Sequence, residues 1–198
     1  MLQRPEEYEK LLPDHYYFVV NRGDIWVGVC QWLARGRKLA TALDPGCGNN
    51  RFATTLCAAG VDARGMDWMR KEKHTRLLCP ERYIEGDVSR LPAEWMRSFD
   101  LVTGFHLLEH MPDAEKAERI LREMERVSRY LVFCEINLDA SPYHTCALSE
   151  QTWLEMWERA FPASAGWELV LRARGFHGAL GSLCLASRLQ PNSQQTGD

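Results

Sequence analysis

The sequence predicts one α/β domain built on a mostly parallel sheet, and three observations support this fold class. Short apolar segments alternate with helical patterns along most of the 198 residues. Two closely spaced glycines, Gly46 and Gly48, join the first of these segments to a helix. Acidic residues recur where strands end, at Asp44, Asp67 and Asp87. Because ligands bind at the carboxyl ends of the strands in open α/β sheets, we expect the functional site at this edge.

Composition excludes several classes of protein. The chain is 45% hydrophobic and 26% charged, and its net charge of -3 provides no field that would attract a nucleic acid. No apolar run approaches the ~20 residues that span a bilayer, and the charged N-terminus does not resemble a secretory signal. Seven cysteines without C-x-x-C spacing indicate free thiols. We therefore expect a cytoplasmic protein without a membrane or nucleic-acid partner.

Residues 1–36 are predicted to form a helical cover that belongs to the same domain as the sheet. Asp24 can cap a helix whose apolar face carries Ile25, Val29, Trp32 and Leu33. The main domain then covers residues 37–189, and the polar tail 190–198 is expected to be disordered.

The segment Thr41–Asn50 predicts a strand, a tight turn and the start of a helix over 51–59. Glycine at positions 46 and 48 permits positive φ and leaves no Cβ in the way. A ligand can therefore approach bare backbone amides at the start of that helix, which is how a nucleotide-like ligand is held.

The next strand, residues 61–67, ends at Asp67, 19 residues after Gly48. A carboxylate at this place can accept one hydrogen bond from each hydroxyl of a ribose, one per oxygen. Asp67 therefore supports a ligand that carries a nucleoside.

The remaining pattern continues the alternation of strands and helices. Strands are predicted at 82–86, 99–105 and 130–136, and helices at 71–78, at 113–129 and after Ser149. Three Glu–Arg pairs at i, i+4 give the helix 113–129 a solvated face. Residues 167–172 and 182–189 predict an antiparallel closing pair.

Together, the segments Leu43–Gly48, Gly86–Val88, Phe99–Val102 and Leu107–Met111, with the acid Asp67, resemble a class I S-adenosylmethionine-dependent methyltransferase, small-molecule type. The resemblance runs from about residue 39 to 189. It implies a Rossmann-like three-layer sandwich whose seven-stranded, mostly parallel sheet has its last strand antiparallel beside the fifth.

The resemblance also implies the cofactor, S-adenosyl-L-methionine, and the residues that bind it. Its methionine end would lie against Asp44, Gly46 and Gly48, its ribose against Asp67, and its adenine against Asp87 and Val88. Trp68, next to Asp67, is included among the cofactor-binding residues, and Phe105 and His106 would lie near the sulfonium. Asn50 stands where the family often has a third glycine. Asn tolerates left-handed geometry, so we expect the turn to form, with a polar contact from the Asn50 side chain to the cofactor.

The implied chemistry is in-line transfer of a methyl group, which requires alignment of donor and acceptor and removal of a proton where the acceptor is a hydroxyl. Histidine is the natural base near neutral pH. We favour His106 and His144 as catalytic residues over His110, although a histidine that only forms hydrogen bonds in a loop remains the alternative for each.

Three other kinds of protein share part of this pattern. His106–His110 matches the H-x-x-E-H pattern of some zinc proteases, but it follows a buried strand and is interrupted by Pro112, so we predict no metal site. Stoichiometric zinc in the purified protein would revive that interpretation. The dinucleotide-binding fingerprint of an NAD(P)-dependent oxidoreductase requires glycine or alanine at the position where this chain has Arg51. A non-catalytic regulatory protein that binds S-adenosylmethionine is the third alternative.

The acceptor pocket is expected to be lined by aromatic residues of the cover and of the segment 137–161: Tyr16, Tyr17, Trp26, Tyr143, Trp153 and Trp157. For Tyr16 and Tyr17, buried packing is the favoured role over roofing a pocket. Such a lining suits a small ring-bearing or sugar-like molecule, methylated on oxygen or nitrogen. We expect a monomer or homodimer.

Overall fold

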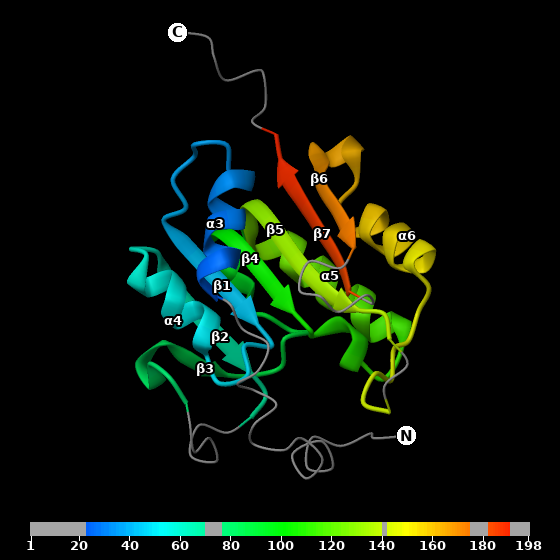
Figure 1. Cartoon of the computed structure of the whole chain (residues 1–198), viewed down its shortest axis with the longest axis horizontal. Coiled ribbons are helices and arrows are strands. Elements are labelled where there is room, and N and C mark those ends of the chain that lie inside the picture. Colours follow the sequence, from blue (N-terminus) through cyan, green and yellow to red (C-terminus); the bar gives the residue numbers. More distant parts are fainter. Residues whose placement is uncertain (1–22, 70–76, 140–141, 175–181, 191–198) are drawn as a thin grey trace, which may run out of the picture.

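The computed structural model describes residues 23–69, 77–139, 142–174 and 182–190 of the chain (Figure 1). The elements are α3 (Gly23–Leu33), β1 (Thr41–Pro45), α4 (Arg51–Ala58), β2 (Asp62–Asp67), β3 (Tyr83–Glu85), β4 (Phe99–Phe105), α5 (Ala114–Val127), β5 (Ser128–Asn137), α6 (Glu150–Ala160), β6 (Trp167–Arg174) and β7 (Ser182–Leu189), with the 3₁₀ turn η4 (Leu108–His110) among the short turns.

The seven strands form one sheet in the order β3-β2-β1-β4-β5-β7-β6. Strands β1 to β5 pair in parallel, whereas β7 is antiparallel to both β5 and β6. The chain passes from β1 to β2 on one side and returns to β4 on the other side of β1. This confirms the predicted fold class, including the antiparallel strand beside β5.

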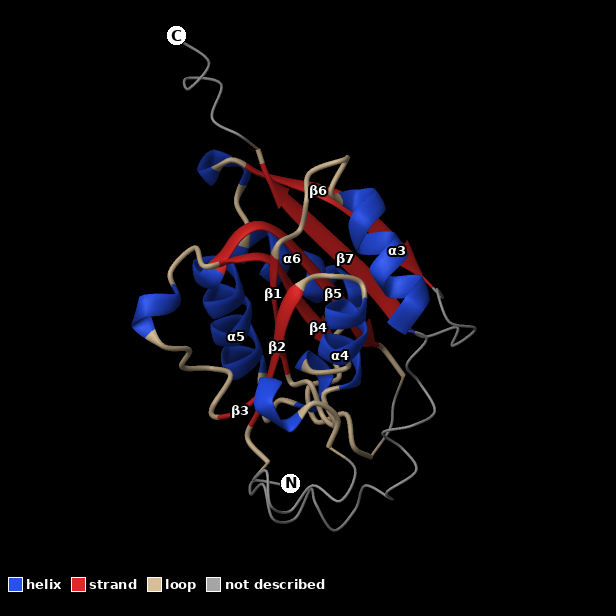
Figure 2. Cartoon of the chain, turned by 90° about the vertical axis from the view of Figure 1, so that its left-hand side faces the viewer, coloured by secondary structure: helices blue, strands red, loops and turns tan. Residues whose placement is uncertain are grey.

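Helices cover both faces of the sheet and give three layers (Figures 1 and 2). Successive strand residues point to opposite faces, so neighbouring residues enter different cores. Ala42, for example, packs with the α3 and α4 side, whereas Leu43 packs with the α5 and α6 side. Because both faces are covered, the central strands are almost entirely apolar, which is why their positions were predictable.

Polar side chains cap the first turns of α5 and α6. The Asp113 side chain accepts a hydrogen bond from the Lys116 amide, and Ser149 does the same for Thr152. Helix α3 includes Gly23, so Asp24 lies inside the helix and its predicted role as the cap is wrong. Trp32 was predicted on the apolar face of this helix, but it is 71% exposed.

Two of the three predicted Glu–Arg pairs of α5 form, Glu115–Arg119 and Glu118–Arg122. The third does not: α5 ends at Val127, so Arg129 lies in β5 and no longer faces Glu125 across a helical turn. Glu125 pairs with Arg97 instead.

The helix predicted at 71–78 lies mostly outside the described residues, and its last two, Leu77 and Leu78, are not helical. The first 22 residues of the predicted cover and most of the tail also lie outside them. No helix in the described part of the chain has the length and apolar character that crossing a membrane requires.

Candidate functional site at the carboxyl ends of the strands

The turn after β1 has the predicted geometry. Gly46 and Gly48 have φ angles of 75° and 52°, in the left-handed region that favours glycine. The Gly46 amide donates to the Met66 carbonyl at 2.7 Å, which ties the turn to β2. A Cβ at Gly46 would lie 2.6 Å from Leu107 Cδ1, so the chain needs glycine here for space as well as for conformation.

Asp67 closes the turn from the adjacent strand. Its Oδ2 accepts a hydrogen bond from the Gly48 amide at 2.9 Å, and its Oδ1 accepts one from the Met69 amide at 3.3 Å. Burial raises the pKa of Asp67, although these backbone hydrogen bonds act to lower it. Trp68, the next residue, is 36% exposed. The structure thus places Asp67 against the glycine turn, as its spacing predicted.

Asp44 is the buried acid of the site, with only 4% of its surface exposed. Its Oδ1 accepts a hydrogen bond from the Thr103 hydroxyl of β4 at 2.7 Å. Burial raises the pKa of Asp44 to about 7; Thr103 opposes this shift and the nearby Asp67 adds to it. The carboxyl is therefore only partly ionised at neutral pH, and a cationic group placed beside it would favour its ionised form.

Asp87 and Val88 follow the next strand, β3. The Gly86 amide donates to the Asp67 carbonyl at 2.9 Å, which brings this strand end beside the turn. The Asp87 carboxylate accepts hydrogen bonds from Ser89 and Lys116. Burial works to raise the pKa of Asp87, but these partners hold it below its ordinary value. Val88 is almost completely buried.

Asn50 corrects one part of the prediction. Its backbone is left-handed, with φ of 65°, as expected for a residue that replaces glycine. Its side chain, however, is fully buried, and Nδ2 donates to the carbonyls of Leu78 and Cys79. The expected contact with the cofactor is therefore wrong for this side chain, which holds a neighbouring loop instead.

The aromatic residues also differ from expectation. Phe105 packs against Trp26, Phe52 and Phe133, with ring centroids 4.7 to 5.5 Å apart, and so joins the core beneath α3 and α4. Trp26, Trp153 and Trp157 are each 1% exposed. The expectation that these tryptophans line an acceptor pocket is wrong, because their rings fill the two cores. Tyr16 and Tyr17 lie outside the described residues, whereas Tyr143 is half-buried.

His106, immediately after β4, lies between two buried glutamates. Nδ1 is 3.0 Å from Glu109 Oε1, and Nε2 is 3.6 Å from Glu135 Oε2. Burial acts to lower the pKa of His106, but the hydrogen bond to Glu109 and the surrounding carboxylates raise it above its ordinary value. These carboxylates thus favour the protonated ring, and the role of His106 as a base stays a prediction.

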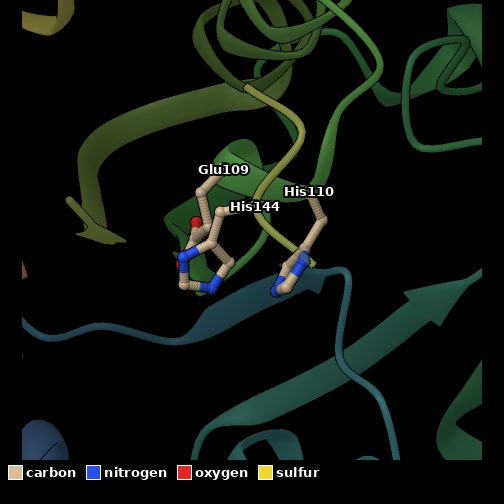
Figure 3. A group of neighbouring side chains, drawn as sticks. All are labelled: Glu109, His110 and His144. Atoms are coloured by element: carbon tan, nitrogen blue, oxygen red, sulfur yellow. The ribbon is translucent and has the colours of Figure 1, made fainter. Parts of the chain in front are cut away.

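His144 has a different setting. It lies in the loop after β5, and its Nδ1 is 2.8 Å from Asp139 Oδ1 and 3.1 Å from the Asp139 carbonyl. The His110 ring packs against the His144 ring, with centroids 5.1 Å apart. Figure 3 shows that His144, His110 and Glu109 point toward one another.

Several residues of the site were missed from the sequence. Thr103 and Gly65 lie inside strands, where nothing distinguishes them from other small residues of a buried sheet. Asp139 sits in a loop whose path a sequence does not define. Only Glu109 belonged to a quoted motif, and its contact with His106 follows from the i, i+3 spacing of the 3₁₀ turn.

Comparison with known proteins agrees with this arrangement. Residues 43–130 match a family described as "Methyltransferase domain". A ubiquinone biosynthesis O-methyltransferase of Chromobacterium violaceum is 29% identical over 123 residues, covering 59% of this chain and 53% of that protein. The chain spans about half the length of the curated relatives it matches.

Solved structures share the whole architecture. An amino pentose methyltransferase, CalS10 from Micromonospora echinaspora, has a TM-score of 0.66 at 13% identity, covering 93% of this chain and 97% of that one. The Burkholderia thailandensis 1,6-didemethyltoxoflavin-N1-methyltransferase has a TM-score of 0.61 at 18% identity, covering 96% and 92%. At these identities the likeness establishes the fold.

The matching segment contains the glycine turn, Asp67 and β4, and the sheet has the strand order implied by the resemblance. Residues 43–130 thus have the sequence pattern of a methyltransferase domain, and the described chain has the fold of solved S-adenosylmethionine-dependent methyltransferases.

Proposed function

We propose that this chain transfers a methyl group from S-adenosylmethionine to a small-molecule acceptor. The observation that carries the proposal is the joining of Asp44, the glycine turn and Asp67 into one unit at the ends of β1 and β2. The Asp67 carboxylate accepts a hydrogen bond from the Gly48 amide. The pairing of β1 with β2 places Asp44 opposite Gly65, two residues before Asp67.

The residues of this unit fit the cofactor in charge and in backbone conformation. Gly46 and Gly48 give the turn its left-handed backbone, and Asp44 offers a buried carboxyl group that a cationic amine would ionise. S-adenosylmethionine, when bound, supplies a methyl group on a positively charged sulfur. The protein has to bind it, align it with the acceptor and exclude water.

We assign the cofactor-binding roles as the family resemblance implies. Asp44, Gly46 and Gly48 would bind the methionine end, Asp67 the ribose hydroxyls, and Asp87 with Val88 the adenine. Trp68 is exposed next to Asp67 and can cover the adenosine with its ring.

On the acceptor side, His144 replaces His106 as the residue of interest. Its Nδ1 faces a backbone carbonyl and must carry the proton, so the lone pair is on Nε2. That nitrogen can accept a proton from a hydroxyl or coordinate a cation. We infer oxygen as the methylated atom, because the curated relatives are named as O-methyltransferases.

The acceptor is proposed to be a small molecule and not a nucleic acid, since the net charge of -3 provides no attraction for a polyanion. The seven cysteines are free thiols, which suits the reducing cytoplasm. A monomer or homodimer remains our proposal for the assembly.

The binding test uses calorimetry with S-adenosylmethionine and, separately, with NAD. We expect micromolar-range affinity for S-adenosylmethionine and no binding of NAD. Asp67→Ala should weaken binding by about 1 to 3 kcal/mol, roughly 5- to 150-fold, because the ribose diol loses its acceptor and the turn loses a hydrogen bond.

Asp62→Ala is the matched control, since this acid lies at the opposite end of β2 and is exposed. Equal affinity in the Asp67→Ala variant and the parent would show that the ribose assignment is wrong. Binding of NAD in place of S-adenosylmethionine would support the oxidoreductase. Tight binding without turnover on any phenolic, sugar or amine acceptor of a panel would favour a regulatory protein.

A further inference from the structure

A second group of side chains beside the cofactor unit has the composition of a metal site. Glu109, His110 and His144 each offer one ligand atom, and these atoms all lie within 4.8 Å of one another (Figure 3). Glu109 and His110 come from η4, whereas His144 comes from the loop after β5. Two segments far apart in the sequence thus bring two imidazoles and a carboxylate together.

Hydrogen bonds to Nδ1 orient both imidazoles. His110 Nδ1 is 2.9 Å from the Tyr143 carbonyl oxygen, and His144 Nδ1 is 3.1 Å from the Asp139 carbonyl oxygen. A carbonyl only accepts, so in each ring Nδ1 carries the hydrogen and Nε2 carries the lone pair. Metal-binding histidines in proteins are held in this way, with the outer nitrogen donating to a carbonyl or carboxylate.

Glu109 provides the second, independent observation. It is fully buried, and its Oε1 accepts hydrogen bonds from the Asn137 amide and from His106, each at 3.0 Å. Its Oε2 is buried without a hydrogen-bond partner among the described residues. A carboxylate oxygen left unpaired in the interior is costly, and a cation would satisfy it.

The charges around the group also favour a cation. Glu109 and Glu135 are both almost completely buried, and the His106 ring lies between them, 3.0 Å from one and 3.6 Å from the other. Asp139, beside His144, adds a third carboxyl group.

We propose that Glu109, His110 and His144 bind a divalent transition-metal cation such as Zn²⁺ or Mn²⁺. Two neutral imidazoles and one carboxylate form the ligand set of many catalytic zinc sites, whereas Mg²⁺ prefers oxygen ligands alone. Ligand atoms ~2.1 Å from a tetrahedral metal lie about 3.4 Å apart, so the three side chains would have to move closer together on binding.

The site differs from the zinc-protease pattern that the sequence contains. In that pattern His106 and His110 would be the paired ligands on one helix. Here η4 is a single 3₁₀ turn, and His106 is paired with Glu109 and Glu135. The metal ligand that accompanies His110 is instead His144, which no local pattern indicates.

The group also lies next to the cofactor unit. Leu107 packs on Gly46 of the glycine turn and is two residues before Glu109. A cation there has coordination positions for an oxygen of the acceptor and would lower the pKa of a hydroxyl bound to it. This step rests on the proposed function, whereas the binding of the cation does not. With His144 coordinated through Nε2, that nitrogen would no longer accept a proton, and the hydroxyl made more acidic by the cation would lose its proton to water.

The test titrates the full-length, chelator-treated protein with Co²⁺, followed by its visible d–d absorption, and then displaces the Co²⁺ with Zn²⁺. We expect one equivalent to bind in the absence of S-adenosylmethionine and of any acceptor. Glu109→Gln and His144→Asn should each weaken Co²⁺ binding at least tenfold. Glu115→Gln, on the exposed face of α5, is the matched control and should bind as the parent does.

Asp139→Asn adds a gentler variant, since it keeps the Asp139 carbonyl and changes only the side chain that also contacts His144 Nδ1, and it should weaken Co²⁺ binding about tenfold. Circular dichroism establishes that each variant is folded. Parent-like Co²⁺ binding by Glu109→Gln, or full displacement by equimolar Mg²⁺, would overturn the proposal, as would no Co²⁺ binding by the parent protein.

Calorimetry with S-adenosylhomocysteine separates this proposal from the proposed function. We expect His144→Asn to retain binding of that compound while it loses Co²⁺. A parent protein that binds Co²⁺ but not S-adenosylhomocysteine would refute the methyltransferase and leave the metal site standing.

Discussion

Asp44→Asn is expected to make the cofactor-free protein more stable above pH 7 and to weaken S-adenosylmethionine binding at least tenfold. Asp44 is buried and carries a pKa of about 7, whereas 3.8 is its ordinary value. Asn keeps the size of the side chain and its acceptor for the Thr103 hydroxyl, but it has no charge to bury. The variant thus removes a cost of folding together with a group that the ligand needs.

The pH dependence has a definite sign. Below about pH 4 the carboxyl is protonated in both states and costs nothing. Between pH 3.8 and about pH 7, Asp44 releases its proton in the unfolded chain but keeps it in the folded chain, so stability falls as the pH rises. Above pH 7 the folded protein has lost all of this stability. A pKa raised by about three units corresponds to a loss of about 4 kcal/mol in the free energy of unfolding. The stability of Asp44→Asn relative to the parent should therefore increase from pH 4 to pH 7 and stay at that higher level at pH 8.

Urea unfolding of both proteins at pH 5 and pH 8 measures this difference. The other titratable groups near Asp44, namely Asp67, Cys30, Cys47 and Cys134, are the same in both proteins. Asp100→Asn is the control. This buried carboxylate accepts hydrogen bonds from the Ala40 and Thr41 amides, so its replacement should lower the stability of the protein. Equal unfolding free energies of Asp44→Asn and the parent at pH 8 would contradict the assignment.

Cofactor binding provides a second measure of the same group. A cationic amine beside Asp44 ionises it, so binding at pH 7 should release up to about half a proton. Calorimetry in phosphate and in Tris detects this release as a difference in apparent enthalpy. The difference should vanish in Asp44→Asn. A parent protein that shows no buffer dependence would place the cofactor's amine elsewhere.

Much of the fold was predictable because it depends on patterns along a single segment. Strand β4 was predicted with its observed bounds, since a strand buried on both faces is apolar from end to end. The glycine turn and Asp67 were also identified, because positive φ needs glycine and a strand end is marked by the turn after it.

The parts that were wrong depend on which way a side chain points. Trp153 and Trp157 fill the core between α6 and the sheet, and composition does not distinguish an aromatic ring in a core from one lining a pocket. For the histidines, their partners decide their roles. His106 meets two glutamates, whereas His144 meets Asp139, and these contacts arise only once β4, β5 and the following loops are assembled.

The importance of Gly65 was also missed, because its contacts arise only once β2 and the glycine turn are assembled. Its replacement is expected to have the second large effect, on both stability and cofactor binding. It lies in β2 directly under the turn, where a Cβ would strike Asn50 Oδ1 and would lie 2.7 Å from Cys47 Cβ. Cys47 Cβ is attached to the backbone of the turn, so it moves only if the turn moves. The Asn50 side chain donates hydrogen bonds to the carbonyls of Leu78 and Cys79, so its displacement would break these bonds. Gly65→Ala should therefore cost about 2 to 3 kcal/mol of stability and abolish measurable S-adenosylmethionine binding.

Gly86→Ala separates this effect from a general loss of glycine. A Cβ at Gly86 would meet only the terminal Cε of Met66 at close range, with the next atom 3.8 Å away. A methionine can change rotamer to make room, so the cost should stay below about 1 kcal/mol and cofactor affinity should change little. Urea unfolding and calorimetry of both variants decide the matter. If Gly65→Ala binds the cofactor like Gly86→Ala, the turn tolerates displacement and its exact position is not what holds the cofactor.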